Sequence, residues 1–191
     1  MFEMAKLVRQ HDEALRECEV RPHSKIYSKV KDLYEEAFPP EERIDLAILD
    51  ELANEHAAEF TAYFDEERFC GFSYSIDTGN YLYLLFLAVS SDTRSRGYGT
   101  RILGQIKTRF PERVIVLEVE PIDQSAPTAL QREKRFAFYR RNGFVPTGYN
   151  SVFGDMNFMF LKTSGPFDAS SCASEISSAL RGLVPFELRL A

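Results

Sequence analysis

Residues 81–101 constrain the fold of this chain more than any other stretch. An apolar run, 81–89, leads through a short polar loop into two glycines, Gly97 and Gly99, and then into a helical pattern. The glycines lack a Cβ, so the backbone can approach a ligand there, and the following helix offers unpaired N–H groups at its positive end. The stretch therefore predicts a strand, an anion-binding turn and a helix, with a phosphate-bearing ligand as the natural occupant.

Arg94, Arg96 and Arg101 flank the glycine turn and would add positive charge where a pyrophosphate needs it. The turn nevertheless differs from the two best-known phosphate motifs. The dinucleotide fingerprint requires a glycine at the position of Ile102, and no Gly-Lys-Ser/Thr follows as a P-loop requires. Because glycine-rich turns are common, a plain helix start is the alternative interpretation of this stretch taken alone.

Length and composition favour one globular domain with appendages. The chain has 191 residues, 45% of them hydrophobic and 27% charged, which is enough to bury a sizeable core. Its net charge of -6 argues against a nucleic-acid binder, because such proteins usually present a basic face. No apolar run approaches the length of a membrane span, and the N-terminus lacks the continuous apolar segment of a signal peptide.

Cysteine and histidine usage indicates neither disulfides nor a metal site. Cys18, Cys70 and Cys172 are widely spaced and contain no Cys-x-x-Cys pair, and the histidines have no metal-ligand spacing. We therefore expect no bound metal. A reduced, cytoplasmic setting without membrane contact fits this usage best.

Hydrophobic periodicity divides the chain into further elements. Helical patterns cover 2–18, 24–37 with Ser24 as a candidate N-cap, 41–54, the stretch from the glycine turn to Phe110, 130–142 and 170–181. Strand patterns cover 59–64, 69–76, 81–89, 114–120 and two segments within 144–162. The strand 114–120 is of the buried kind that helices on either side favour as parallel to 81–89. The tail 183–191 shows no clear period.

Two linked motifs resemble one known family. Arg94-x-x-Gly97-x-Gly99 follows an apolar strand, and Phe138-Tyr139-Arg140-Arg141-Asn142-Gly143-Phe144 follows roughly forty residues later. Together, and on matching elements, they resemble the GCN5-related N-acetyltransferases (GNAT). The resemblance implies an α/β (α+β) fold, with a mixed, mostly antiparallel sheet that splays between its fourth and fifth strands and is flanked by helices. It also implies acetyl-coenzyme A in the opening, as co-substrate.

The resemblance divides the chain into three parts and assigns the cofactor contacts. Residues 24–163 would form the acetyltransferase domain, 1–23 an N-terminal extension that is helical in part, and 164–191 a helix and tail packed on the domain. The strand end would offer backbone hydrogen bonds to the pantetheine arm, and the turn would cradle the pyrophosphate through main-chain N–H groups. The residues concerned are Leu87, Ala88 and Val89 for the arm, and Arg94, Ser95, Arg96, Gly97, Tyr98, Gly99 and Thr100 for the pyrophosphate.

The resemblance also assigns the chemistry. Tyr139 takes the position of the general acid that protonates the departing thiolate, and a backbone N–H such as that of Val89 would stabilise the oxyanion. A role in packing is the alternative for Tyr139. Glu118 lies on the strand that would border the split and is the candidate general base, with Glu120 on the same face. Surface salt bridges are the alternative for both carboxylates.

Two further features bear on the acceptor. Glu41 and Glu42 fall where the family builds its acceptor pocket, although carboxylates in a first helical turn more often stabilise the helix. Many relatives carry an asparagine about seven residues before the tyrosine, whereas Arg132 stands there in this chain. The pantetheine contacts of that helix therefore differ from the common pattern.

The sequence thus predicts an acetyltransferase that acts on a primary amine, either in a small molecule or in a peptide. A coenzyme A-binding regulatory or sensor module without turnover is the alternative from another class, and a different acyl donor is a third. The apolar tail, with Val184-Pro185-Phe186, Leu188 and Leu190, either packs on the core or meets a partner, a homodimer among the options. No nucleic-acid or membrane partner is expected.

Overall fold

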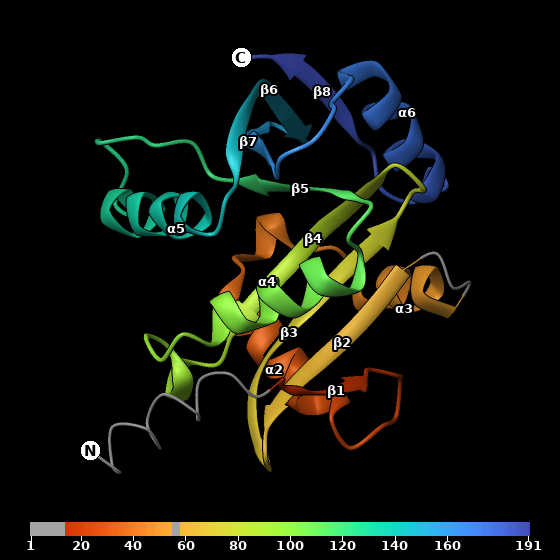
Figure 1. Ribbon diagram of the computed structural model, residues 1–191, viewed down its shortest axis with the longest axis vertical. Helices are drawn as coiled ribbons and strands as arrows, with labels where there is room; N and C mark the ends of the chain where they lie inside the picture. Colours follow the sequence, from red (N-terminus) through yellow and green to blue (C-terminus); the bar gives the residue numbers. More distant parts are fainter. Residues whose placement is uncertain (1–13, 55–57) are drawn as a thin grey trace.

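One sheet organises the molecule. The computed structural model describes residues 14–54 and 58–191, and within them the strands form an eight-stranded sheet in the order β1-β2-β3-β4-β5-β7-β6-β8 (Figure 1). The strands are β1 Arg16–Glu19, β2 Ala58–Asp65, β3 Arg68–Asp77, β4 Tyr81–Val89, β5 Val114–Val119, β6 Val145–Phe153, β7 Met156–Lys162 and β8 Glu187–Leu190. Neighbouring strands are antiparallel except β4 and β5, which are parallel as the sequence predicts.

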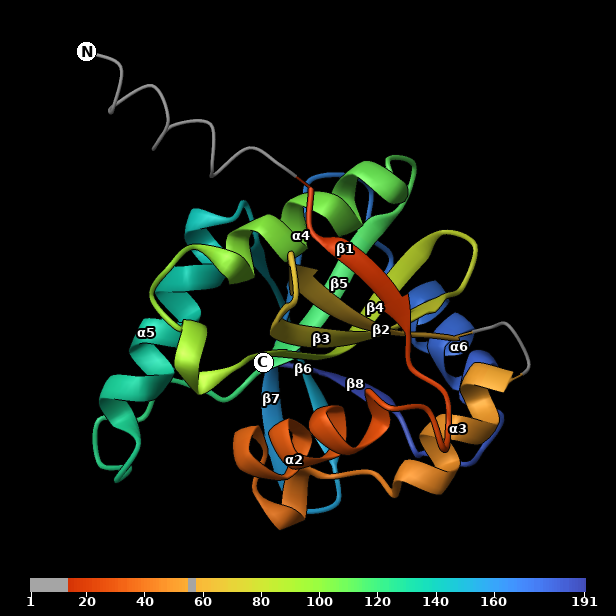
Figure 2. The same cartoon turned by 90° about the horizontal axis from the view of Figure 1, so that it is seen from below.

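Helices cover both faces of this sheet. They are α2 Tyr27–Ala37, α3 Leu46–Asn54, α4 Tyr98–Arg109, α5 Ala129–Arg141 and α6 Ala169–Ala179, with short 3-10 turns η1 Pro40–Glu42 and η2 Ser91–Thr93. Helices α4 and α5 lie on one face, and α2 and α3 lie on the other (Figure 2). Helix α6 packs into the same apolar cluster as α2 and α3.

The sheet opens between β4 and β5. Pairing between these strands is confined to residues 81–83 of β4 and 114–116 of β5, after which the strands diverge (Figure 1). The expected splay between the fourth and fifth strands is therefore confirmed. We call the opening beyond these paired residues the sheet gap.

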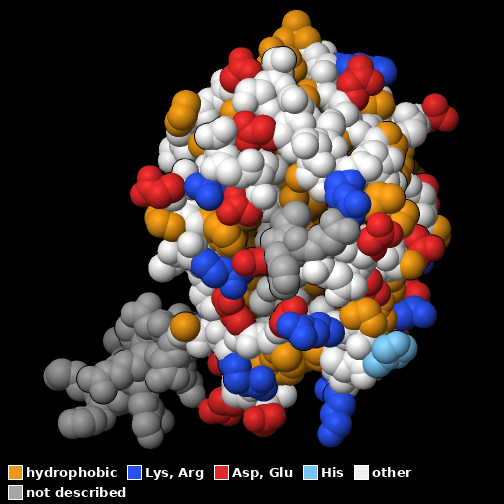
Figure 3. Space-filling model, turned by 90° about the vertical axis from the view of Figure 1, so that its right-hand side faces the viewer, with side chains coloured by type: hydrophobic (Ala, Val, Ile, Leu, Met, Phe, Trp, Pro, Cys, Tyr) orange, Lys and Arg blue, Asp and Glu red, His pale blue; other side chains and the backbone are white. Residues whose placement is uncertain are grey.

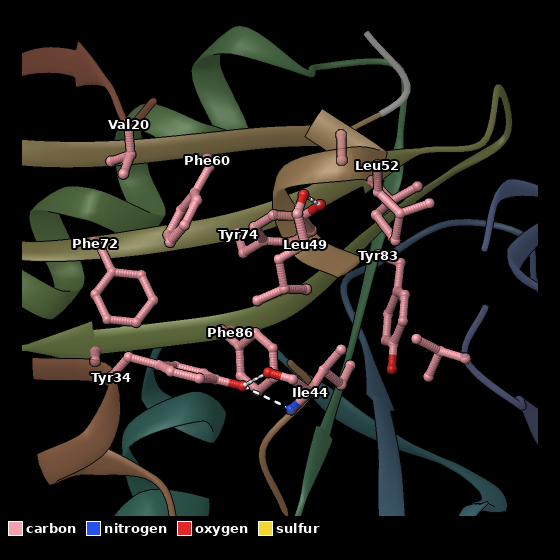
Figure 4. Packing of buried hydrophobic residues seen from close by; sticks show 14 of the residues in the cluster. Val20, Tyr34, Ile44, Leu49, Leu52, Phe60, Phe72, Tyr74, Tyr83 and Phe86 are labelled. Carbon is pink, nitrogen blue, oxygen red and sulfur yellow. Dashed lines mark hydrogen bonds between the residues drawn. The ribbon is translucent and has the colours of Figure 1, made fainter. Parts of the chain in front are cut away.

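Each face of the sheet has its own apolar cluster. The α2, α3 and α6 face is rich in aromatic rings, where Phe60, Phe72 and Phe86 lie along the sheet and Tyr34 packs against the last two (Figure 4). The rings of Tyr34 and Phe86 meet edge to face with centroids 5.0 Å apart, a favourable geometry for aromatic pairs. The α4 and α5 face contains the predicted apolar residues of α4, Ile102, Leu103 and Ile106, all buried.

The structure corrects three predictions about the first half of the chain. The helix expected over 2–18 is wrong for residues 16–18, which pair with β2, and the part up to residue 13 lies outside the described residues. Ser24 is not the N-cap of α2, which begins at Tyr27 after a turn. The helix expected from Glu41 begins at Leu46, because the Asp45 carboxylate accepts a hydrogen bond from the Ala47 N–H at 2.9 Å and caps the helix there.

The C-terminal tail is more ordered than its sequence indicates. Residues 187–190 form β8, which pairs antiparallel with β6 and becomes an edge strand of the sheet. The sequence gives little sign of this strand, because four residues are too few for a period of two to stand out. The tail therefore joins the same sheet as β4, the strand that leads into the glycine turn.

The surface gives a mixed picture of charge. On the face shown in Figure 3, Lys and Arg side chains lie among acidic and apolar ones. None of the helices that the structure describes combines the length and the apolar character needed to cross a bilayer.

Candidate active site

A cavity of about 1070 Å³ lies at the sheet gap. Its walls come from the second half of β4, the glycine turn, α5 and the end of β5, and further from the loop after α2, from β6 and β7, and from residues 180–186. The predicted catalytic residues Glu118 and Tyr139 both line it. The cavity therefore brings together residues that lie far apart in the sequence.

The end of β4 directs backbone groups into the gap. The Ser90 N–H donates to the Cys70 carbonyl at 2.9 Å, so by the alternation of an antiparallel ladder the backbone groups of Ala88 face β3. Those of Leu87 and Val89 face the gap, and the Arg94 Nε–H donates to the Val89 carbonyl from that side at 3.3 Å. The Val89 N–H thus points away from β3 and into the sheet gap, as an oxyanion donor must.

The glycine turn presents a row of free donors. Ser95 and Gly97 adopt left-handed backbone conformations, with φ of 63° and 84°, and α4 begins at Tyr98. The first hydrogen bond within α4 runs from the Arg101 N–H to the Gly97 carbonyl at 3.1 Å. In the part of the chain that the structure describes, the N–H groups of residues 95–100 have no acceptor. Such a concave row at a helix N-terminus suits the oxygens of a phosphate.

The two glycines serve different purposes. Gly97 lines the cavity, and a Cβ there would meet nothing within 4 Å. A Cβ on Gly99 would come within 2.9 Å of the Phe138 ring on α5. Gly97 therefore supplies backbone conformation and access, whereas Gly99 allows α4 and α5 to pack closely.

Two arginines that flank the turn are engaged by carboxylates. Arg94 Nη2 lies 3.1 Å from Glu36 on α2, and Arg101 Nη2 lies 3.5 Å from Asp65 at the end of β2. Thr93, which the sequence reasoning missed, is buried and donates through Oγ1 to the Cys70 carbonyl at 3.2 Å. These contacts hold the glycine turn and its flanks against α2 and against strands β2 and β3.

Tyr139 lies in an aromatic setting at the wall of the cavity. Its ring meets Phe138 and Phe144 edge to face, with centroids 5.1 and 5.6 Å apart. The turn at Gly143 allows the Phe144 N–H to donate to the Tyr139 carbonyl at 3.1 Å. Burial raises the pKa of Tyr139 to about 12, and Arg135 lowers it in part. The hydroxyl is therefore protonated at neutral pH and able to donate.

Glu118 is a carboxylate without an ion-pair partner. It is partly buried on β5, and among the described residues no Lys or Arg lies within ion-pair distance of it. Burial raises its pKa, and the nearby hydroxyls of Ser151 and Tyr83 oppose that rise. The Ser151 Oγ is buried and has no partner within hydrogen-bond distance in the described chain, so its approach to Glu118 is a longer one. A carboxylate in such a place is suited to accept a proton.

Comparison with known proteins identifies the family. The model of the family described as Acetyltransferase (GNAT) family matches residues 24–144. The chain belongs to this family. The two motifs predicted this family, which the matching model describes as acetyltransferases.

Individual relatives agree with the family. The protein YjbC of Bacillus subtilis (strain 168), assigned as an acetyltransferase, is 34% identical over 65 residues, which are 34% of this chain and 31% of YjbC. The match thus spans about a third of that protein. A solved structure from Bacteroides thetaiotaomicron, assigned to the GNAT family, is 27% identical with a TM-score of 0.69, over 87% of this chain and 96% of the other.

An aminoglycoside 6'-N-acetyltransferase solved with coenzyme A shares the fold. It is 19% identical with a TM-score of 0.60, over 80% of this chain and 99% of the other.

The other acidic candidate, Glu120, is held in salt bridges. Arg135 and Arg132 lie 2.5 and 3.1 Å from its carboxylate. Arg132, which replaces the family's usual asparagine, also donates to Thr128 Oγ1 at 3.0 Å and so serves the loop before α5. The salt-bridge interpretation therefore applies to Glu120 and not to Glu118. The strand ends at Val119, so Glu120 has already left the sheet.

Several cavity residues of the acetyltransferase gave no signal in the sequence. Gln131 and Lys134 line the cavity from the face of α5 that also carries Phe138, at the spacing of one helical face. Tyr83, which also lines the cavity, lies on β4, and Ser151 near Glu118 lies on β6, two strands that β5 and β7 separate in the sheet. Of the two acidic residues after α2, Glu42 lines the cavity; burial first, and then Glu120, raises its pKa. Among the described residues no group of His, Cys, Asp and Glu could hold a metal ion.

Proposed function

We propose that this acetyltransferase transfers the acetyl group to a primary amine by direct attack, with Glu118 as general base and Tyr139 as general acid. The observation that carries the proposal is that one cavity is lined by both groups and by the free donors of the glycine turn. The coenzyme A bound to the aminoglycoside 6'-N-acetyltransferase of similar fold supports a ligand of this kind.

Binding would rest on the main chain. The N–H groups of residues 95–100 would hold the pyrophosphate, and Lys134 and Arg141 on α5 line the same cavity and add positive charge. The backbone groups of Leu87 and Val89 that face the gap would hold the pantetheine arm. When bound, acetyl-coenzyme A supplies a thioester carbonyl, and the Val89 N–H would polarise its oxygen.

The proton inventory follows from the two side chains. Glu118 would take a proton from the ammonium form of the acceptor, so that a neutral amine forms the new C–N bond and then loses a second proton to solvent. The C–S bond breaks, and Tyr139 would donate to the sulfur and recover its proton from water. A free thiol has a pKa of about 8.5, well below the Tyr139 value of about 12. Tyr139 therefore acts chiefly through a hydrogen bond that tightens as charge develops on sulfur.

The direct test is release of free thiol from acetyl-coenzyme A across a panel of amines, with mass spectrometry of the acetylated product. Thiol release that depends on the amine, with matching product, would support the transferase. Coenzyme A binding without turnover on any amine would instead favour the regulatory or sensor module. Mass spectrometry of cofactor carried through purification would identify a different acyl donor.

Replacing Tyr139 by Phe tests the general acid. We expect kcat to fall about 10²-fold while the affinity for coenzyme A changes little, because only the hydroxyl is removed from a ring that stays packed between Phe138 and Phe144. Tyr149→Phe is the matched control, since Tyr149 lies on β6 and does not line the cavity. Steady-state kinetics and titration calorimetry give the two quantities. A fully active Tyr139→Phe enzyme would assign Tyr139 to packing.

The wider setting is also part of the proposal. We propose a reducing, cytoplasmic environment on the ground that Cys18, Cys70 and Cys172 are free thiols. We further propose that residues 24–163 carry the transferase unit and that residues 164–191 complete it from the side of the acceptor. A homodimer stays a prediction; β8, an exposed edge strand that carries Leu190, is the surface we would examine first.

A further inference from the structure

The cavity continues into an apolar chamber on the α2, α3 and α6 face of the sheet. The chamber is lined by side chains from the loop after α2, from β6 and β7 and from the C-terminal segment, and we define it by Phe38, Ile44, Phe153, Phe158, Val184 and Phe186. Glu118 and the Tyr83 ring border it on the sheet side. A ligand that crosses the sheet gap toward Glu118 therefore meets aromatic and aliphatic surface.

The walls of the chamber are held in place from two sides. The Tyr34 hydroxyl accepts the Ile44 N–H at 2.7 Å and donates to the Ile44 carbonyl at 3.0 Å, which fixes the loop after α2 (Figure 4). The Phe186 ring meets Tyr83 and Phe160 with centroids 5.4 and 5.9 Å apart. Since β8 follows directly and pairs with β6, the chamber wall at 184–186 is anchored to the sheet. A preformed wall of this kind selects by shape.

Charge is divided between the two ends of the cavity. The Lys and Arg side chains that line it, among the described residues, belong to the glycine turn or to α5, where an anionic cofactor would lie: Arg94, Lys134, Arg135 and Arg141. Of the carboxylates that line it, Glu36 is paired with Arg94, and Glu120 is paired with Arg132 and Arg135. The other two, Glu118 and Glu42, border the chamber. Glu42 lies near Arg135 and Arg132, whose charges partly offset its own, whereas Glu118 has no such partner. One uncompensated carboxylate therefore faces the chamber.

We infer that the acceptor is a small primary amine with a single positive charge on an apolar, aromatic-sized body, and that Phe186 of the C-terminal segment forms the wall that selects it. This rests on the proposed function. The ammonium would meet Glu118, and the apolar body would fill the chamber. Polycations such as aminoglycosides and polyamines are disfavoured, because their remaining charges and hydroxyls would be buried against apolar side chains without partners.

An acceptor panel tests the class of amine. The panel contains 2-phenylethylamine, 1,4-diaminobutane, kanamycin and a tripeptide with N-terminal phenylalanine, each assayed for thiol release. We expect kcat/KM for 2-phenylethylamine to exceed that for each of the others by about tenfold or more. A preference for the diamine, kanamycin or the tripeptide would overturn the inference and leave the transferase standing. Coenzyme A binding without thiol release for any amine would overturn the proposed function and the inference together.

Variants of the chamber wall test the role of the C-terminal segment without using the acyl donor. Titration calorimetry would measure binding of the product N-(2-phenylethyl)acetamide to the chain in the absence of coenzyme A. We expect Phe186→Ala to weaken this binding about tenfold, the lower end of what burial of a phenyl group contributes. Leu190→Ala is the matched control, because Leu190 lies on the same tail and is 78% exposed.

Phe153→Ala, on β6, provides a second variant in case Phe186→Ala does not fold, and melting temperatures report on folding. We expect the same loss of affinity, because Phe153 is partly buried in the chamber wall. Unchanged product binding in the variants that fold would overturn the chamber as the acceptor site.

Discussion

Gly97→Glu is expected to weaken coenzyme A binding at least about 100-fold. Gly97 lines the cavity and a side chain there meets open space, so a glutamate is expected to reach the place proposed for the pyrophosphate and bring a negative charge with it. Phosphate oxygens that are kept out of this place also lose their attraction to the neighbouring N–H groups, which adds to the repulsion. Titration calorimetry with coenzyme A measures the effect.

The matched control is Gly97→Gln, which has nearly the same volume and no charge. Both substitutions place a non-glycine residue at φ 84°, which costs about 1–3 kcal/mol of stability. Their melting temperatures should therefore fall alike, whereas the glutamate variant should bind coenzyme A much more weakly than the glutamine variant. Equal affinities in the two variants would show that strain, and not charge at a phosphate site, explains the loss; wild-type affinity in both would remove the glycine turn from the cofactor site.

The sequence predicted well where a pattern is long and local. The strand 81–89, the glycine turn and the following helix were all predictable, because an apolar run, two glycines and a 3.6-residue period each carry an independent signal. The parallel pairing of β5 with β4 was likewise predictable from a buried, β-branched run between helices. These elements place the cofactor side of the cavity.

Prediction failed where tertiary partners decide. Residues 16–18 carry a helix-like pattern and form an edge strand, since pairing with β2 outweighs local preference. Residues 187–190 become a strand only because β6 offers an unpaired edge. The acceptor side depends on such segments, so Tyr83 and Ser151 gave no signal in the sequence, and Phe186 was noted only as part of an apolar tail that packs on the core or meets a partner.

The pair Glu118 and Glu120 shows the same limit within one element. Alternation along a strand places both carboxylates on one face, and the sequence alone left both as candidates for the base. In the structure β5 ends at Val119, so Glu120 turns toward Arg135 and Arg132 on α5. Where a strand ends is set by its neighbours. Here the end of β5 at Val119 separates the ion-paired Glu120 from Glu118 at the sheet gap.

Glu118→Gln is therefore expected to lower kcat/KM about 10²- to 10⁴-fold at neutral pH, the usual contribution of a positioned base. Glu120→Gln makes the same chemical change two residues away and should lower turnover far less, because Glu120 is already paired with two arginines. Without Glu118, only acceptor that is already neutral can react. The rate of the variant should then rise about tenfold per pH unit up to the pKa of the amine, whereas the wild type levels off above the raised pKa of Glu118.

The melting temperature of Glu118→Gln gives a second test, because this substitution is expected to raise stability although it lowers activity. Burial raises the pKa of Glu118, so between the unfolded value of about 4.3 and the higher folded value the native state binds more protons than the unfolded chain. Stability from this group therefore falls as pH rises through that window, and at pH 7 the ionised carboxylate costs free energy. Glu118→Gln should thus melt at a higher temperature than the wild type at pH 7, with the difference shrinking toward pH 4.

The two measurements together separate a base from a structural residue. If a carboxylate stabilises the fold, replacing it lowers both the stability and the activity of the protein. For the ion-paired Glu120 we expect replacement to lower the stability alone. If a carboxylate is kept in an apolar site for its chemistry, replacing it lowers the activity of the protein and raises its stability. A Glu118→Gln enzyme that is less stable at pH 7, or one that keeps the pH profile of the wild type, would remove Glu118 from the mechanism and require another base, with Glu42 next to be replaced.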